Sequence, residues 1–111
     1  MNLKQETLQI LERHGLSVDD IEWIGTREYT IPFDRELSVL DVDYDNGFGG
    51  QEISEELIVV GKYFWLERHE YDGSEWWEFK AMPIKPNEVR GYTKVEGGSW
   101  ETLEEINERI D

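Results

Sequence analysis

The sequence predicts an α+β fold, in which a three- to four-stranded antiparallel sheet packs with N-terminal, middle and C-terminal helices. Two observations carry this prediction. Three segments rich in β-branched and aromatic residues follow one another over residues 56–82, separated by tight-turn residues, and amphipathic helical patterns lie on either side of them. A length of 111 residues suits one hydrophobic core, so we expect residues 1–111 to form a single domain.

Before the sheet, the pattern predicts a helix, a strand and a second helix. The first helix covers residues 3–14, because its apolar residues recur at helical spacing and Gly15 is a typical helix end. Residues 21–31 are aromatic and β-branched and predict a strand. Pro32 then suits the first position of a short helix that ends near Asp41.

The meander begins with the apolar run Leu57 to Val60, which predicts a strand buried on both faces. Gly61-Lys62 and Asp72-Gly73 predict two-residue turns on either side of the middle strand. With these turns, the core-face pairs are Val59 with Phe64, Leu57 with Leu66, Phe64 with Ala81, and Leu66 with Phe79.

The opposite face of this meander is both aromatic and polar. It would carry Ile58, Val60, Tyr63, Trp65, Glu67, His69, Trp76, Glu78, Lys80 and Met82. Glu67 would lie opposite Glu78, and like charges destabilise a strand pair, so a counterion, a raised pKa or a basic partner would explain them. With His69 the two carboxylates could also form a metal site or an acid/base pair. The alternatives are that the long side chains splay into water, and that a terminal helix covers this face.

After the sheet, Pro83 and Pro86 predict its end, and residues 88–95 predict a short edge strand. A last helix is predicted from its cap at Ser99. Its buried stripe would consist of Trp100, Leu103, Ile106 and Ile110. Of the five tryptophans, we expect Trp23, Trp77 and Trp100 in the core, and we expect Trp65 and Trp76 on the aromatic and polar face.

Charge is the main indication of function. There are 26 acidic and 11 basic residues, a net charge of −15, which disfavours direct binding to nucleic acid or to an anionic membrane and favours a basic partner. The alternative is that the acidity serves only solubility. The sequence has no cysteine and no signal-peptide pattern, and no serine and histidine arrangement typical of a nucleophilic enzyme. We therefore expect a cytoplasmic protein that is not an enzyme. We expect no cofactor other than calcium, for which residues 41–52 are the candidate site.

Residues 41–52 resemble an EF-hand calcium loop. Asp41, Asp43, Asp45 and Glu52 fall at loop positions 1, 3, 5 and 12, and Phe48 falls at position 8. The sequence departs from the pattern because position 6 is Asn46, position 9 is Gly49, and a strand is predicted after the loop. An acidic surface loop is the alternative interpretation.

Residues 65–80, WLERHEYDGSEWWEFK, resemble segments of small acidic proteins encoded by phages and prophages of Gram-positive bacteria. The resemblance implies a context in which some such proteins inhibit host enzymes by presenting carboxylates where phosphates would lie.

Our leading hypothesis is an acidic protein-binding domain of this inhibitor type, which engages a basic, nucleic-acid-binding host protein. The predicted partner-binding residues are Asp34, Glu36, Asp41, Asp43, Asp45, Glu52, Glu55, Glu56, Trp65 and Trp76. The alternatives are a calcium-binding domain that uses Asp41, Asp43, Asp45 and Glu52, and a structural or accessory domain.

Overall fold

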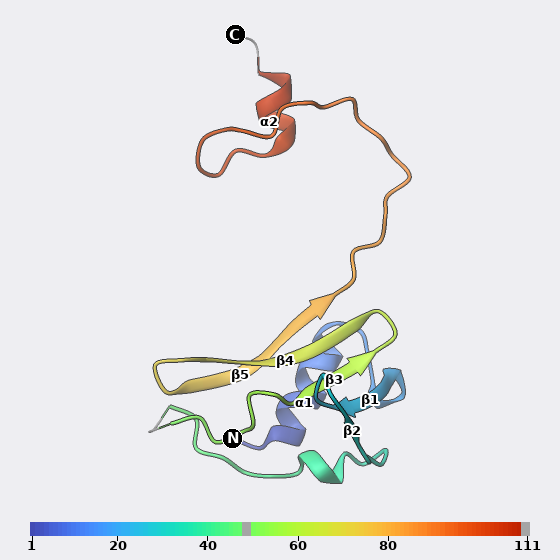
Figure 1. Ribbon diagram of the computed structural model, residues 1–111, viewed down its shortest axis with the longest axis vertical. Coiled ribbons are helices and arrows are strands. Elements are labelled where there is room, and N and C mark those ends of the chain that lie inside the picture. Colours follow the sequence, from blue (N-terminus) through green and yellow to red (C-terminus); the bar gives the residue numbers. More distant parts are fainter. Residues whose placement is uncertain (48–49, 110–111) are drawn as a thin grey trace.

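A computed structural model describes residues 1–47 and 50–109 and shows an α+β fold built on one antiparallel sheet (Figure 1). The elements in chain order are helix α1 (Leu3–Arg13), 3-10 helix η1 (Val18–Asp20), strands β1 (Ile21–Gly25) and β2 (Thr30–Ile31), 3-10 helix η2 (Ser38–Leu40), strands β3 (Ile58–Gly61), β4 (Phe64–Tyr71) and β5 (Ser74–Ala81), and helix α2 (Leu103–Glu108). The five strands lie in the order β2-β1-β3-β4-β5, so the sheet is wider than the predicted three or four strands.

The first helix is confirmed. Asn2 caps it, because its side-chain oxygen accepts a hydrogen bond from the Gln5 backbone N–H. At the other end Gly15 has φ +71° and the Leu16 N–H bonds back to the Leu11 carbonyl, which satisfies a carbonyl that the helix leaves free.

The predicted single strand over residues 21–31 is wrong, because the segment folds into the β1–β2 hairpin. The Thr26 hydroxyl accepts hydrogen bonds from the N–H groups of Glu28 and Tyr29, which holds the turn. Gly25 permits the tight return: a Cβ at this position would lie 2.3 Å from the Tyr29 carbonyl oxygen.

The predicted helix over residues 32–41 is also wrong, since only η2 forms there. The Asp34 carboxylate accepts the Ser38 N–H, and Leu37 has φ +53°, outside the right-handed helical region. The local hydrogen bond and this backbone angle replace a regular helix, yet Leu37 and Leu40 still enter the core.

The meander and the pairing of β4 with β5 are confirmed, including Phe64 with Ala81 and Leu66 with Phe79. The pairing of β3 with β4 differs by two residues, because Val59 pairs with Leu66. Gly61 ends strand β3 instead of beginning the turn, so the turn consists of Lys62 and Tyr63. A Cβ at position 61 would collide with the Phe64 ring and the Asp20 carbonyl. A shift of two residues keeps every side chain on its predicted face.

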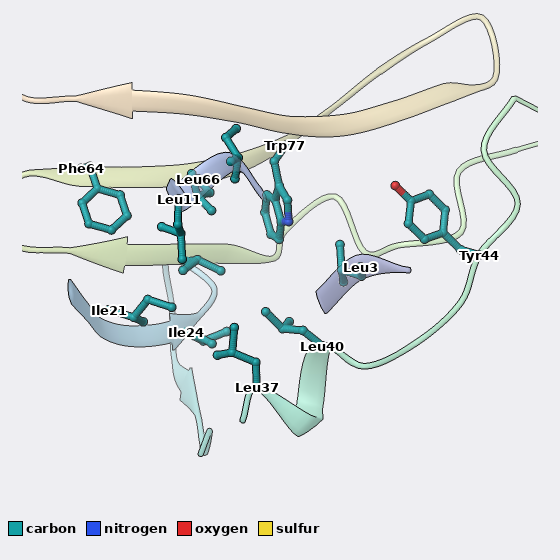
Figure 2. Close-up of a cluster of buried hydrophobic side chains, with 12 residues drawn as sticks. Leu3, Leu11, Ile21, Ile24, Leu37, Leu40, Tyr44, Phe64, Leu66 and Trp77 are labelled. Atoms are coloured by element: carbon teal, nitrogen blue, oxygen red, sulfur yellow. The ribbon is translucent and has the colours of Figure 1, made fainter. Parts of the chain in front are cut away.

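One face of the sheet carries the core, shown in Figure 2. Helix α1 and the segment around η2 pack against this face. Of the predicted core-face residues of the meander, Val59, Phe64 and Leu66 lie in the core, Leu57 and Phe79 pack against it, and Ala81 is exposed. The core consists of Leu3, Ile10, Leu11, Ile21, Ile24, Leu37, Leu40, Tyr44, Val59, Phe64, Leu66 and Trp77. The expectation that Trp77 is buried is confirmed.

The C-terminal predictions are wrong in three respects. Residues 88–95 form no strand, α2 is capped by Thr102 instead of Ser99, and α2 lies away from the sheet (Figure 1). Trp100, expected in the core, is 97% exposed with φ +74°, and Leu103 is exposed as well. Of the predicted stripe only Ile106 is buried, against Gly97, while Ile110 lies outside the described residues.

Short-range contacts explain the position of α2. The Asn107 side chain accepts the N–H groups of Thr93 and Lys94 and donates to the Lys94 carbonyl, so the helix is attached to the chain just before it. Within the described residues, no helix is long and apolar enough to cross a membrane. That the whole chain forms a single domain stays a prediction.

Candidate functional site: the open sheet face

The face of the sheet opposite the core has no helix on it in the described part of the chain (Figure 1). Strand alternation places an aromatic and charged set there, which we call the open face: Trp23, Ile58, Val60, Trp65, Glu67, His69, Trp76, Glu78 and Lys80. The sequence left open whether a helix covers this face, and the structure leaves it uncovered.

The centre of the open face is a pair of carboxylates. Glu67 lies directly opposite Glu78 on β4 and β5, as the sequence predicted. Each accepts a hydrogen bond from a tryptophan two residues earlier in its own strand: the Trp65 indole N–H donates to Glu67 at 3.1 Å, and the Trp76 indole N–H donates to Glu78 at 3.0 Å. The two indoles therefore fix the two carboxylates, which we call the carboxylate pair.

The positive groups beside the carboxylate pair leave it incompletely neutralised. His69 Nε2 lies 3.8 Å from Glu67, at the limit of an ion pair. Lys80 lies on the same face, opposite Trp65, and forms no ion pair with either carboxylate within the residues described. The pair thus remains a concentration of negative charge on an uncovered surface.

We expect the double substitution Glu67→Gln and Glu78→Gln to stabilise the isolated chain. Glutamine keeps a hydrogen-bond acceptor for each indole and removes the repulsion between the two strands. The free energy of unfolding should therefore rise by roughly 0.5 kcal/mol. Urea unfolding followed by tryptophan fluorescence measures it, with Glu104→Gln and Glu105→Gln on α2 as the control of equal charge change. A clear loss of stability in the first variant would mean that the carboxylates are needed to hold the strands together.

Two residues were not assigned to this surface from the sequence: Trp23, which belongs to the open face, and Arg27, which borders it. Trp23, expected in the core, is half-buried and pairs with Val60 on the open face. Arg27, from the β1–β2 turn, lines a hollow of about 280 Å³ together with Trp23, Ile58, Val60 and Trp65. The alternation of β1 against β3 is the signal that would have placed Trp23, but it required the pairing of these strands to be known.

The predicted acidic residues form several separate groups. Asp34 and Glu36 lie before η2, where the hydrogen bonds from Ser38 lower the pKa of Asp34 below its usual value. Glu55 and Glu56 lie in the turn before β3, and Glu56 lines a second hollow with Thr26, Arg27 and Glu28. Glu56 thus lines a hollow together with Arg27 at the border of the open face.

In the loop that resembles an EF-hand, the carboxylates of Asp41, Asp43 and Glu52 accept hydrogen bonds from the protein itself. Asp41 and Asp43 both accept the Asn2 side-chain amide at 2.9 Å, and Glu52 accepts the Asp45 backbone N–H. Positions 8 and 9 of the loop, Phe48 and Gly49, lie outside the described residues. Among the residues that are described, no three acidic or histidine side chains are grouped to hold a metal ion. Calcium binding stays a prediction, which requires a chelator-reversible rise in Tm.

Behind the open face lies a buried ionic network that the sequence analysis missed. Arg68 follows Glu67 in β4 and therefore points to the core face, where its side chain is 0% exposed. Its guanidinium donates to Glu75 at 2.9 Å and to Glu6 at 3.3 Å, and it lies over the Trp77 ring. Its Nε is buried without a partner in the described part of the chain.

This network also attaches the loop over residues 41–53 to the sheet. The Glu75 carboxylate accepts the backbone N–H groups of Glu52 and Ile53, and the Glu75 N–H donates to the Asn46 side chain. Burial lowers the pKa of Arg68, but its hydrogen bonds to Tyr44 and Glu75 outweigh this effect and raise the pKa. The guanidinium therefore stays charged.

Comparison with known proteins adds no family to this description. No family model matches the sequence, and searches of curated proteins and of solved structures gave no significant match.

Proposed function

We propose that the chain is a non-enzymatic protein-binding domain that engages a basic partner through the open face and the acidic groups next to it. The observation that carries this proposal is the carboxylate pair, held by two indoles on a sheet face that no helix covers in the described part of the chain. Tryptophan is enriched in binding hot spots, and a surrounding negative field steers a basic partner toward it.

The type of partner follows from the charge. With a net charge of −15, the chain repels phosphate groups and attracts proteins that bind them. The resemblance of residues 65–80 to small phage proteins supports the finer proposal of an inhibitor that competes with nucleic acid for a host protein. Competition of this kind weakens steeply as salt is raised.

The test is affinity capture, in which the immobilised chain is incubated at low salt with a lysate of a Gram-positive bacterium. Bound proteins are then eluted with DNA and identified by mass spectrometry. The expected result is a saturable, basic, nucleic-acid-binding protein that DNA displaces. If no saturable partner is recovered from that host, or if the partner remains bound when DNA is added, the inhibitor function is contradicted.

A pair of matched variants shows whether the acidic groups take part. Glu55→Gln with Glu56→Gln neutralises two exposed carboxylates next to the open face, and Glu104→Gln with Glu105→Gln makes the same charge change on α2. We expect the first variant to bind the captured partner about tenfold more weakly, a loss of roughly 1.4 kcal/mol, and the second to bind it as the wild type does. Equal weakening of both would indicate only a general effect of net charge.

A further inference from the structure

The open face has two neighbouring parts with different chemistry. One is the carboxylate pair on β4 and β5, and the other is the hollow of about 280 Å³ over β1 and β3. Its volume lies at the lower end of the range of small-molecule pockets and is large enough for one large side chain. Its lining is mainly apolar and aromatic: Trp23, Ile58, Val60 and Trp65, with Arg27 from the turn.

Trp65 joins the two parts. Its ring lines the hollow, and its indole N–H donates to Glu67 of the carboxylate pair. In the register, Ile58 lies beside Glu67 and Glu67 lies beside Glu78, so two strand spacings, about 10 Å, separate the hollow from the far carboxylate. One short peptide segment with long side chains can reach both parts.

The charges on this face determine the orientation of such a segment. Arg27 lies in the hollow, where it disfavours a cation and permits an apolar side chain. The carboxylate pair favours a cation, and His69 and Lys80 are the positive groups next to it. Trp76 and Trp65 on either side of the pair offer ring faces and edges to a guanidinium or an ammonium group.

We infer that the open face binds a segment of a basic protein that inserts a large apolar side chain into the hollow and places an arginine or lysine on Glu67 and Glu78. This inference rests on the proposed function and specifies what the partner presents. The apolar anchor supplies burial, and the cation neutralises the two opposed carboxylates, which explains why like charges are kept opposite each other on β4 and β5.

The indole N–H groups provide a direct test by ¹⁵N NMR. The probe is the peptide acetyl-Phe-Gly-Arg-amide, and the resonances of Trp65 and Trp76 are identified by single Trp→Phe variants. We expect saturable shifts of these two indole signals, because a cation on Glu67 and Glu78 perturbs the bonds that both indoles donate. The Trp77 indole donates to Thr7 in the core and should stay unchanged, as an internal reference.

Matched probes and variants separate the two parts of the site. Acetyl-Phe-Gly-Gln-amide lacks the cation and acetyl-Ala-Gly-Arg-amide lacks the anchor, and each is expected to bind about tenfold more weakly than the first probe. Glu67→Gln with Glu78→Gln should remove the preference for arginine over glutamine, whereas Glu104→Gln with Glu105→Gln should retain it. Unchanged Trp65 and Trp76 signals, or equal shifts with the arginine and glutamine probes, would overturn the inference.

Failure of this inference is distinguishable from failure of the proposed function. If affinity capture yields a basic partner and that partner leaves the Trp65 and Trp76 indole signals unchanged, the chain binds through another surface. Binding of a basic partner then stands as the function, whereas the open face as its binding surface, and with it this inference, is rejected. If neither capture nor the peptide titration shows binding, both are rejected.

Discussion

Substitution of Arg68 by methionine is expected to lower the free energy of unfolding by about 3–5 kcal/mol, a large part of the stability of a domain of this size. The Arg68 side chain is 0% exposed, and Glu75, its ion-pair partner, is 1% exposed. Methionine fills a similar volume but leaves the carboxylates of Glu6 and Glu75 without the charge that they face. Urea unfolding followed by tryptophan fluorescence measures the loss.

Two further variants test whether charge, and not packing, causes this loss. Arg68→Lys retains the charge but cannot bond to Glu6, Tyr44 and Glu75 at once, so its loss should be smaller than that of methionine. Adding Glu75→Gln to Arg68→Met removes one of the orphaned charges and should restore part of the stability. If the free energy of unfolding of Arg68→Met lies within about 1 kcal/mol of the wild-type value, the ionic network is not essential for stability.

The meander was predictable because local signals agree there. Asp72 and Gly73 have φ of +50° and +85°, the two positive angles that a tight hairpin turn of this type needs, and Asp-Gly is the typical sequence for it. From that turn outward, the alternation of β4 and β5 determines the register, so the positions of Glu67, Glu78, Trp65 and Trp76 on one face followed from the sequence.

Apart from helix α1, the elements before and after the meander were less predictable, because non-local or single-residue interactions decide them. The β1–β2 hairpin depends on the Thr26 hydroxyl and on the close approach at Gly25. Helix α2 has an amphipathic pattern, but Asn107 ties it to residues 93–94 instead of letting it reach the sheet. An apolar stripe predicts that a helix buries one face, and does not say against which neighbour.

The candidate site was predictable only in part for the same reason. Alternation assigns Arg68 to the core face beside Leu66, which is a signal of an unusual buried cation. Its partners Glu6 and Tyr44 lie 62 and 24 residues away in the chain, so the sequence gives no indication of them. Likewise the hollow exists because Trp23 and Arg27 meet Trp65 across β3, which depends on the strand order.

The buried network and the open face are two sides of the same strands. Glu67 and Arg68 are consecutive in β4 and point to opposite faces, and Trp76 and Trp77 do the same in β5. The contacts of Arg68 and Glu75 therefore hold the two strands that carry the carboxylate pair. A binding surface on such strands is pre-organised, which reduces the entropy lost when a partner binds.

Raising the pH from 10 to 12 is expected to lower the stability of the wild type by about 2 kcal/mol more than that of Tyr44→Phe. Burial, together with the hydrogen bond that the hydroxyl donates to Glu6, raises the pKa of Tyr44 from 10.0 to about 12. Figure 2 shows this side chain extending from its loop toward the side of Leu3 and Trp77, with the hydroxyl at the end of the ring farthest from the backbone. Below pH 10 the hydroxyl is protonated in both the folded and the unfolded state, so its contribution is fully present.

As the pH passes 10, the unfolded chain releases this proton while the folded chain retains it, so unfolding becomes easier until the folded pKa is reached. The Tyr44→Phe variant lacks the ionisable group, so its free energy of unfolding should decline less steeply with pH. At pH values below 10 its free energy of unfolding should be about 1 kcal/mol lower than that of the wild type, because the hydrogen bonds of the hydroxyl are lost. Tyr71→Phe, at an exposed position, is the matched control and should follow the wild type. Urea unfolding at intervals between pH 10 and pH 12 measures the free energy of unfolding of all three chains. If the curves of stability against pH are parallel for the wild type and Tyr44→Phe, the folded structure does not raise the pKa of Tyr44.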